Sequence, residues 1–261
     1  MTRYAVWAPP YRHKSGGIRA LHVLCEELRK REQDAGIVSF LGDWQPSPYD
    51  APRFDSDAAG DVIHVYPEII SDNPGGGLYA RWLLNKADLD GACWGWMPSM
   101  QHPVLHVPII DLRIFYPRSG LRRGVGVWCG KQLPDVGRIP EGATMISIDH
   151  PESREDLADL LGGFEYIISF DPFSSLVTEA TLCGTPVRVF TTPQWSRNDL
   201  NNPFEKPLGI AFDDQDWSIA VDSVKDAHEA YRIATKRMLR TVDEFVESAP
   251  SRCSSPDRIS L

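Results

Sequence analysis

The first half of the chain alternates short apolar runs with a stretch of helical spacing. Four runs are typical of buried strands and are separated by turn-rich segments; they lie at 3–8, 37–41, 61–66 and 92–97. Apolar residues recur every three or four positions after the first run and predict a helix there, at Ile18, Leu21, Leu24, Cys25 and Leu28. Residues 78–86 predict a second helix.

The second half repeats this alternation. Strands are predicted at 124–129, 144–148, 166–170 and 186–190, and helices at 152–161 and 174–182. Residues 216–246 have helical character with scattered charge. The segment 248–261 is rich in Ser, Pro and Arg and has few apolar residues to bury, so we expect it to be disordered.

Alternating strands and helices predict an α/β fold with parallel sheets flanked by helices. The pattern breaks near the midpoint, in a Pro- and Gly-containing stretch at 115–120. We therefore expect an N-terminal domain over 1–118, a C-terminal domain over 119–247 and a tail over 248–261. The length of 261 residues is sufficient for two cores of about 120 residues each. Open parallel sheets bind ligands beyond the carboxyl ends of their strands, so two such domains predict a cleft between them.

Charge and cysteine content narrow the function classes. A formal charge of -9 disfavours a general nucleic-acid coat or an anionic membrane surface as partner. The five cysteines form no C-x-x-C pair and lie mostly in apolar runs, as reduced core thiols do. No stretch approaches the eighteen or so apolar residues of a membrane span, and the N-terminus lacks the apolar region of a signal peptide. We expect a soluble, cytoplasmic protein.

The segment 168–187 holds the most candidate chemistry. A predicted strand ends at Asp171, Ser174 and Ser175 open a predicted helix, and Glu179 follows within it. Backbone amides at a helix start bind anions, and a diphosphate suits such a site. A carboxylate farther along the helix can accept hydrogen bonds from a ribose diol. The alternative is an ordinary strand and a capped core helix that ends in a glycine-proline turn.

The same segment resembles the signature of retaining glycosyltransferases with the GT-B fold. In that family an acidic residue is followed by seven residues and then Glu-Ala, and a Gly-x-Pro-Val turn closes the segment. Asp171 and Glu179 match this spacing, with Asp in place of the more common Glu. The resemblance implies two Rossmann-like lobes, a nucleotide-diphosphate sugar as donor, no required metal or other cofactor, and no protein nucleophile. The residues implied as catalytic are Asp171, Lys131 and Glu179, and those implied to bind the donor are Gly130, Lys131, Phe173, Ser174, Ser175, Leu176 and Glu179.

A second match follows the predicted strand at 124–129. Gly130 and Lys131 come directly after it and resemble the strand-Gly-Lys that opens the donor lobe in this family. There the lysine neutralises the donor diphosphate, and an ammonium held in place stabilises charge that develops on a leaving group. The alternative is a solvated turn lysine.

The N-terminal domain carries two further resemblances. Between the first strand and helix lies a Ser-Gly-Gly sequence, which resembles the Gly-Gly loop of GT-B acceptor lobes; glycines there allow the backbone to approach a ligand. A Tyr-Pro-Glu stretch at 66–68, with Arg-x-x-Leu-Asn-Lys at 81–86, is similar to some bacterial and viral sugar transferases. A flexible turn and a capping glutamate are the alternatives. The residues assigned to an acceptor or phosphate site are Ser15, Gly16, Gly17, Arg19, His22, Tyr66 and Glu68.

Positive charge gathers near the predicted domain boundary of this acidic chain, at Arg113, Arg118, Arg122, Arg123, Lys131 and Arg138. Three interpretations stay open: phosphate binding, a solvated face, or binding of DNA with hydroxymethylated bases, an acceptor of some related phage-type enzymes. Phosphate contacts would make DNA binding fall steeply with salt. The expected acceptor is therefore a glycan, a lipid-linked sugar or a modified DNA base.

Two other functions are compatible with parts of the pattern, and a third is disfavoured by it. Asp55 and Asp57, and likewise Asp88 and Asp90, spell the D-x-D with which one-lobed glycosyltransferases hold Mn²⁺ on a nucleotide sugar. A non-catalytic nucleotide-sugar binding module would bind the donor without turnover. A Rossmann-type epimerase is disfavoured because both G-x-G-x-x-G and Tyr-x-x-x-Lys are missing.

Overall fold

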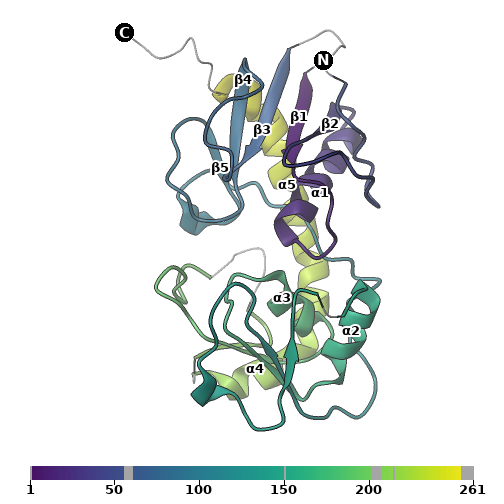
Figure 1. Cartoon of the computed structure of the whole chain (residues 1–261), viewed down its shortest axis with the longest axis vertical. Helices are drawn as coiled ribbons and strands as arrows, with labels where there is room; N and C mark the ends of the chain where they lie inside the picture. The colour runs from purple at the N-terminus through teal and green to yellow at the C-terminus, as the bar shows by residue number, and fades with distance from the viewer. Residues whose placement is uncertain (1, 56–60, 150, 201–206, 214, 254–261) are drawn as a thin grey trace. The chain divides into compact units, whose positions relative to one another are not determined.

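The computed structural model describes residues 2–55, 61–149, 151–200, 207–213 and 215–253. Within them the chain forms two compact units (Figure 1). Each unit is built on a five-stranded parallel sheet. Unit 1 comprises Met1–Ile109 and Lys236–Leu261, and unit 2 comprises Ile110–Thr235. The predicted α/β fold with parallel sheets and flanking helices is confirmed.

Unit 1 has the strand order β2-β1-β3-β4-β5. Its strands are β1 (Arg3–Ala8), β2 (Asp34–Ser39), β3 (Val62–Pro67), β4 (Leu78–Leu83) and β5 (Cys93–Gly95). Its helices are α1 (Gly16–Lys30), the short η1 (Pro98–Met100) and the C-terminal part of α5 (Ala227–Arg252). The core forms where the sheet meets α5: the ring of Phe245 lies 5.9 Å from that of Tyr4 and 5.0 Å from that of Trp94.

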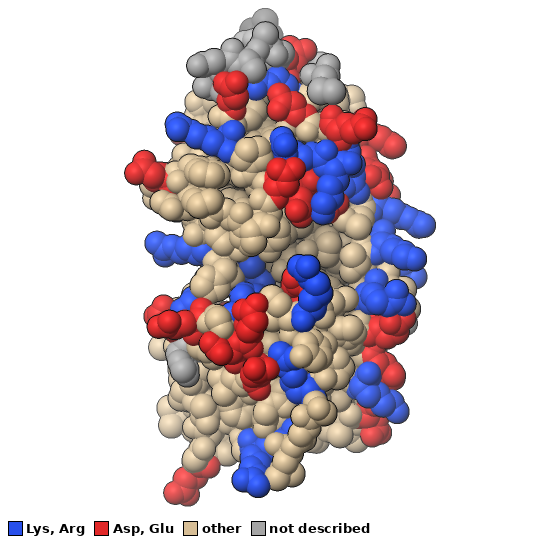
Figure 2. Space-filling view, turned by 90° about the vertical axis from the view of Figure 1, so that its right-hand side faces the viewer, with Lys and Arg blue, Asp and Glu red and all other residues tan. Residues whose placement is uncertain are grey.

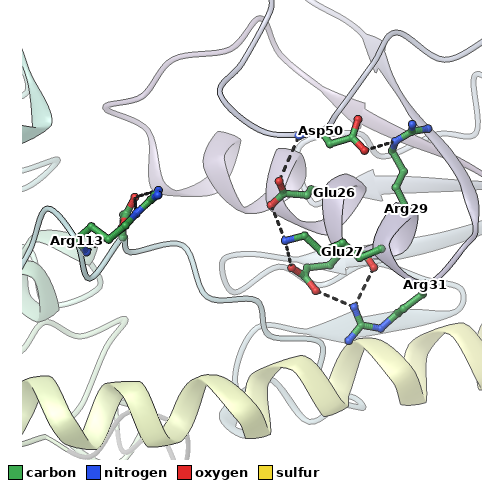
Figure 3. A network of polar contacts seen from close by, with 8 residues as sticks. Glu26, Glu27, Arg29, Arg31, Asp50 and Arg113 are labelled. Carbon is green, nitrogen blue, oxygen red and sulfur yellow. Dashed lines mark hydrogen bonds and ion pairs between the residues drawn. The ribbon is translucent and has the colours of Figure 1, made fainter.

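The C-terminal end of α1 is held by ion pairs. Arg31 donates from Nη1 to Glu27 at 2.7 Å and from Nε to Asp243 of α5 at 2.6 Å. Arg29 donates to Asp50 at 2.9 Å, and Figure 3 shows this pair beside the Arg31 and Glu27 contact. Basic residues at a helix C-terminus also suit its dipole. These contacts tie α1 to α5 and to the segment that follows β2.

Unit 2 has the strand order β10-β9-β8-β6-β7. Its strands are β6 (Val125–Trp128), β7 (Thr144–Ile146), β8 (Tyr166–Ser169), β9 (Val187–Val189) and β10 (Ile210–Phe212). Its helices are α2 (Arg154–Gly163), α3 (Ser175–Leu182), α4 (Trp217–Ser223), the short η2 (Val136–Arg138) and η3 (Val224–Asp226), and the first part of α5. One buried cluster of this unit consists of Val127, Ile168, Phe170 and Phe190.

The helix predicted at 78–86 is wrong. The chain forms β4 there, because this segment pairs with β3 on one side and with β5 on the other. Ala80 and Trp82 point to the same side of the strand and are fully buried. Leu, Ala and Arg favour helices in isolation, so pairing with both neighbours overrides local preference.

The domain limits also differ from the expected ones. The boundary was expected between 118 and 119, whereas the units part between Ile109 and Ile110. The C-terminal domain was expected to run to 247, but the chain joins unit 1 again from Lys236 because the second part of α5 packs there. The expected disordered tail at 248–261 begins as helix, since α5 continues to Arg252. Residues 254–261 lie outside the described residues.

Each sheet has a topological switch point, where two successive connections from one strand lead to its opposite sides. In unit 1, β2 lies on one side of β1 and β3 on the other; in unit 2, β7 lies on one side of β6 and β8 on the other. All paired strands are parallel, so their carboxyl ends share one edge. Ligands in open α/β sheets bind at such switch points. A ligand-binding site is therefore expected at the segments that follow β1 and β3 in unit 1, or β6 and β8 in unit 2.

Candidate functional site

The loops after β6 and β8 meet at the switch point of unit 2. Gly130 and Lys131 follow β6, and Asp171 follows β8. The two strands pair in parallel with Trp128 opposite Ser169, so the loops leave the sheet side by side. The structure thus brings together three predicted site residues, although 40 positions separate Lys131 from Asp171.

The carboxylate of Asp171 binds backbone amides. Oδ2 accepts the N–H of Lys131 at 3.3 Å, and the N–H of Phe173 is a second donor. Burial raises the pKa of Asp171 above its ordinary value, against the lowering effect of these two amides and of the Lys131 charge. Gly130 has a φ of +55°, and a Cβ added to it would lie 2.1 Å from Oδ2 of Asp171. The carboxylate therefore organises both loops, and the turn at 130–131 packs directly on it.

Helix α3 begins at the same edge. Ser174 is its N-cap and accepts the N–H of Leu176 on Oγ at 3.3 Å, and Ser175 is the first helical residue. The first turn contains no acidic residue, and the positive end of the helix dipole lies at the same sheet edge as Lys131 and the carboxylate of Asp171. The side chain of Leu176 is buried, and its backbone N–H donates to the capping serine. Only its position in the first turn of the helix therefore fits a donor-binding role.

Glu179 does not lie at this edge as an exposed carboxylate. Its side chain is 2% exposed, and Oε1 accepts from Nη2 of Arg154 on α2 at 3.0 Å. The Arg154 guanidinium also lies over the ring of Phe115, 4.4 Å from its centroid. The structure therefore pairs Glu179 with an arginine where a ribose contact was expected.

Sequence reasoning did not identify Arg154. A signal for its position exists: Ser153 caps α2 by accepting the N–H of Asp156 on Oγ at 3.0 Å, and this Ser-x-x-acid pattern marks a helix start. The pattern places Arg154 at the first helical position but does not reveal a partner 25 residues away on another helix.

In unit 1 the Ser-Gly-Gly sequence starts α1 at the carboxyl end of β1. Ser15 is the N-cap and accepts the N–H of Ile18 on Oγ at 3.4 Å, and Gly16 opens the helix. A Cβ added to Gly17 would lie 3.6 Å from Leu84, which follows β4, so the helix start lies close to the carboxyl edge of the sheet. The first turn contains no acidic residue. These three residues therefore form a capped helix start without an acidic side chain, the kind of helix start at which anions bind in other proteins.

Arg19 and His22 point into the interior. Arg19 is 2% exposed and donates from Nη1 to the carbonyl of Ile109 at 3.1 Å. His22 is buried, with Nδ1 3.0 Å from Oγ of Ser47, and burial lowers its pKa to about 4. Their expected contact with an acceptor or a phosphate finds no support in this arrangement, because neither side chain reaches the surface.

Tyr66 and Glu68 hold loops. The hydroxyl of Tyr66 donates to Oδ1 of Asn73 at 2.7 Å and accepts the N–H of Gly75 at 2.9 Å. Glu68 accepts the N–H of Leu84, which follows β4, on Oε2 at 3.0 Å, so it joins two loops and does not cap its own turn by this bond. Both residues lie at or after the carboxyl end of β3, yet their polar atoms are used to order the segments that follow β3 and β4.

The predicted basic cluster does not form one patch. Arg122 and Arg123 precede β6 whereas Lys131 follows it, so these charges lie at opposite edges of the sheet. On the face shown in Figure 2, basic and acidic side chains are interspersed. Several of the six residues are paired: Arg113 with Asp111 (also in Figure 3), Arg118 with Asp159, and Arg138 with Asp135.

The D-x-D pairs receive no support as a metal site. Among the described residues, no group of three or more His, Cys, Asp or Glu side chains is arranged to hold a metal ion. Asp88 and Asp90 lie in the loop after β4, and Asp57 lies outside the described residues. In the part of the chain that the structure describes, no helix combines the length and the hydropathy needed to cross a membrane.

Neither protein-family models nor curated sequences supply a relative of this chain. Function is therefore inferred from the two sheet edges: one has Gly130, Lys131 and the start of α3, and the other has the start of α1.

Proposed function

We propose that the chain is a glycosyltransferase that moves a sugar from a nucleotide-diphosphate sugar to an acceptor hydroxyl, with the donor bound by unit 2. The observation that carries the proposal is the meeting of Lys131 and the start of α3 with Asp171 at the switch point of the sheet. A cationic side chain and a helix N-terminus at one edge suit a diphosphate.

Each of these groups has a defined part in the proposed reaction. The diphosphate leaves with developing negative charge, which the ammonium of Lys131 and the amides at the start of α3 would stabilise. Asp171 would not contact the donor itself. It would hold the turn that carries Lys131, because its carboxylate accepts the backbone N–H of Lys131 at 3.3 Å. No step requires a metal ion, in keeping with the retaining, metal-independent chemistry that the sequence resemblance implies.

As acceptor we favour a glycan or a lipid-linked sugar over DNA with hydroxymethylated bases. Duplex DNA needs a continuous basic surface, and here Arg122 and Arg123 lie at the sheet edge opposite Lys131. The start of α1 in unit 1, at Ser15, Gly16 and Gly17, would take the acceptor or a phosphate attached to it. Salt-sensitive binding of duplex DNA would reverse this preference.

The test is a thermal-shift and hydrolysis screen of the full chain against UDP-, GDP-, ADP- and CMP-sugars, with and without EDTA. We expect one nucleotide-diphosphate sugar to raise Tm and to be hydrolysed slowly, and EDTA to leave both effects unchanged. Loss of hydrolysis in EDTA and its recovery with Mn²⁺ would favour the D-x-D alternative. Absence of any response would reject the proposed function.

A second candidate is a non-catalytic nucleotide-sugar binding protein. The observation that favours it is that both predicted catalytic carboxylates are engaged within the protein, Asp171 by backbone amides and Glu179 by Arg154. This candidate predicts the same rise in Tm with no release of sugar, in the absence or presence of any acceptor.

A further inference from the structure

Two aromatic rings join neighbouring loops beside the start of α3. Phe173 follows β8 and Trp195 follows β9, and the two strands pair in the sheet. The rings stack with centroids 4.1 Å apart and planes 10° apart. Trp195 is 3% exposed while Phe173 is half-buried. The tryptophan is therefore the supporting ring, and the phenylalanine is the one closer to solvent.

Hydrogen bonds within the loop after β9 hold Trp195 in place. Trp195 and Thr192 exchange two backbone hydrogen bonds of 3.1 Å, and Oγ1 of Thr192 accepts the N–H of Trp195 at 3.1 Å. One residue earlier, Thr191 donates from its amide and its hydroxyl to the carboxylate of Asp213, which follows β10. The loop after β9 is thus anchored independently of Phe173.

Phe173 lies between two elements of the proposed donor site. Its N–H donates to Asp171, and it directly precedes Ser174, the N-cap of α3. The stack with Trp195 limits the rotamers of Phe173 and thereby the backbone conformations that are compatible with them. We propose that Trp195 is a positioning residue for the donor loop at 171–175. It fixes Phe173 and, through Phe173, the Asp171 contact and the start of α3 that would bind the donor diphosphate.

This inference rests on the proposed function and deepens it. An aromatic pair contributes an amount that corresponds to a factor of about two to ten in a binding constant. We expect Trp195→Ala to raise the donor Kd and KM about three- to tenfold, with the acceptor KM unchanged. Trp195→Phe keeps a ring against Phe173 and is expected to restore most of the donor affinity.

The matched control is Trp217→Ala. Trp217 packs on Tyr166 with centroids 5.4 Å apart, and Tyr166 is the first residue of β8, at the sheet edge opposite Asp171. Donor Kd is measured by calorimetry with the nucleotide sugar that stabilises the wild-type chain, at a temperature where each variant is folded. We expect Trp217→Ala to lower Tm and to leave the donor Kd unchanged. If Trp195→Ala does not fold, Phe173→Leu replaces it, with the same expected rise in Kd.

The outcomes separate the two claims. Wild-type affinity in Trp195→Ala or in Phe173→Leu, or an equal loss in Trp217→Ala, would overturn the positioning role while the proposed function stands. If the wild-type chain binds no nucleotide sugar at all, the proposed function is rejected and the inference with it.

Discussion

The turn after β6 packs so closely on Asp171 that position 130 has no room for a side chain. A Cβ on Gly130 would lie 2.1 Å from Oδ2 of Asp171 and 2.6 Å from its Cβ, and the residue has a φ of +55°. The contact between the carboxylate and the glycine thus joins the loops that follow two neighbouring strands, β6 and β8.

We expect Gly130→Ala to destabilise the chain and to weaken donor binding. The left-handed conformation alone costs an alanine about 1–2 kcal/mol, and the contact with Asp171 adds to that cost because the carboxylate must move. Gly142→Ala is the matched control, since Gly142 has a φ of +75° and nothing within 4 Å of an added Cβ. Chemical unfolding should show a larger loss for Gly130→Ala. An equal loss of unfolding free energy in the two variants would mean that the Asp171 carboxylate can move away from the added Cβ without destabilising the chain.

Lys131→Ala is expected to lower kcat about 100-fold without affecting folding. The contact of Lys131 with Asp171 is made by its backbone N–H, which alanine retains, and the side chain is exposed. The substitution therefore removes only the ammonium that would stabilise the leaving diphosphate, and the loss of one such group typically costs a factor of about 10²–10³. Lys131→Arg should keep most of the activity. An unchanged kcat at an unchanged Tm would remove the lysine from the mechanism.

Breaking the pair between Arg154 and Glu179 should be costly, and replacing both residues should not be. Glu179→Ala removes this carboxylate from a guanidinium that is only 14% exposed, and loss of one partner of a buried pair costs about 3–5 kcal/mol. Replacing the pair by Met and Leu is expected to be much closer to neutral. Urea unfolding of the two single variants and the double variant checks this, and additive losses would contradict it.

Donor binding by Glu179→Gln separates the two roles of this position. The amide can still accept a hydrogen bond from Arg154 but lacks the charge. If a ribose diol displaces the arginine and binds the carboxylate, the donor KM should rise about tenfold, as expected for hydrogen bonds to a charged group. A donor KM equal to that of the wild type at full stability would assign Glu179 to structure alone.

His22 should make the chain less stable in mild acid. Burial lowers its pKa from 6.5 to about 4 in the folded chain, so between these values the unfolded chain binds more protons. Stability therefore falls as pH drops from 6.5 towards 4, by an amount on the order of 1–2 kcal/mol at pH 5. Urea midpoints at pH 7 and pH 5 should differ less for His22→Gln than for the wild type. The pKa of His64 is also lowered by burial and contributes the same slope to both proteins, so identical slopes would exclude His22 as the cause.

Elements whose signals lie within one turn of chain were predictable. Strand β8, helix α3 and strand β9 lie within about a residue of their expected positions, because apolar spacing, the serine cap and a glycine-proline turn are local. Gly184 follows α3 with a φ of +81°, as a helix-ending glycine should. Strand β4 was not predictable in this way, because its residues favour a helix until β3 and β5 supply hydrogen-bonding partners.

Some residues of the candidate site could likewise be predicted from local sequence signals, and others could not. Gly130, Lys131, Asp171 and the start of α3 were expected together, and parallel pairing of β6 with β8 brings them to one edge. Arg19 and His22 were expected at a ligand and lie in the interior, because a polar residue on an amphipathic helix can face either side.

The sequence by itself determined the alternation of strands and helices, the caps and the spacing of the candidate residues. Only the tertiary structure decided that Glu179 meets Arg154, that Trp195 stacks on Phe173 and that α5 ends in unit 1. Such contacts depend on strand order and on packing between segments far apart in the chain, which no local preference encodes.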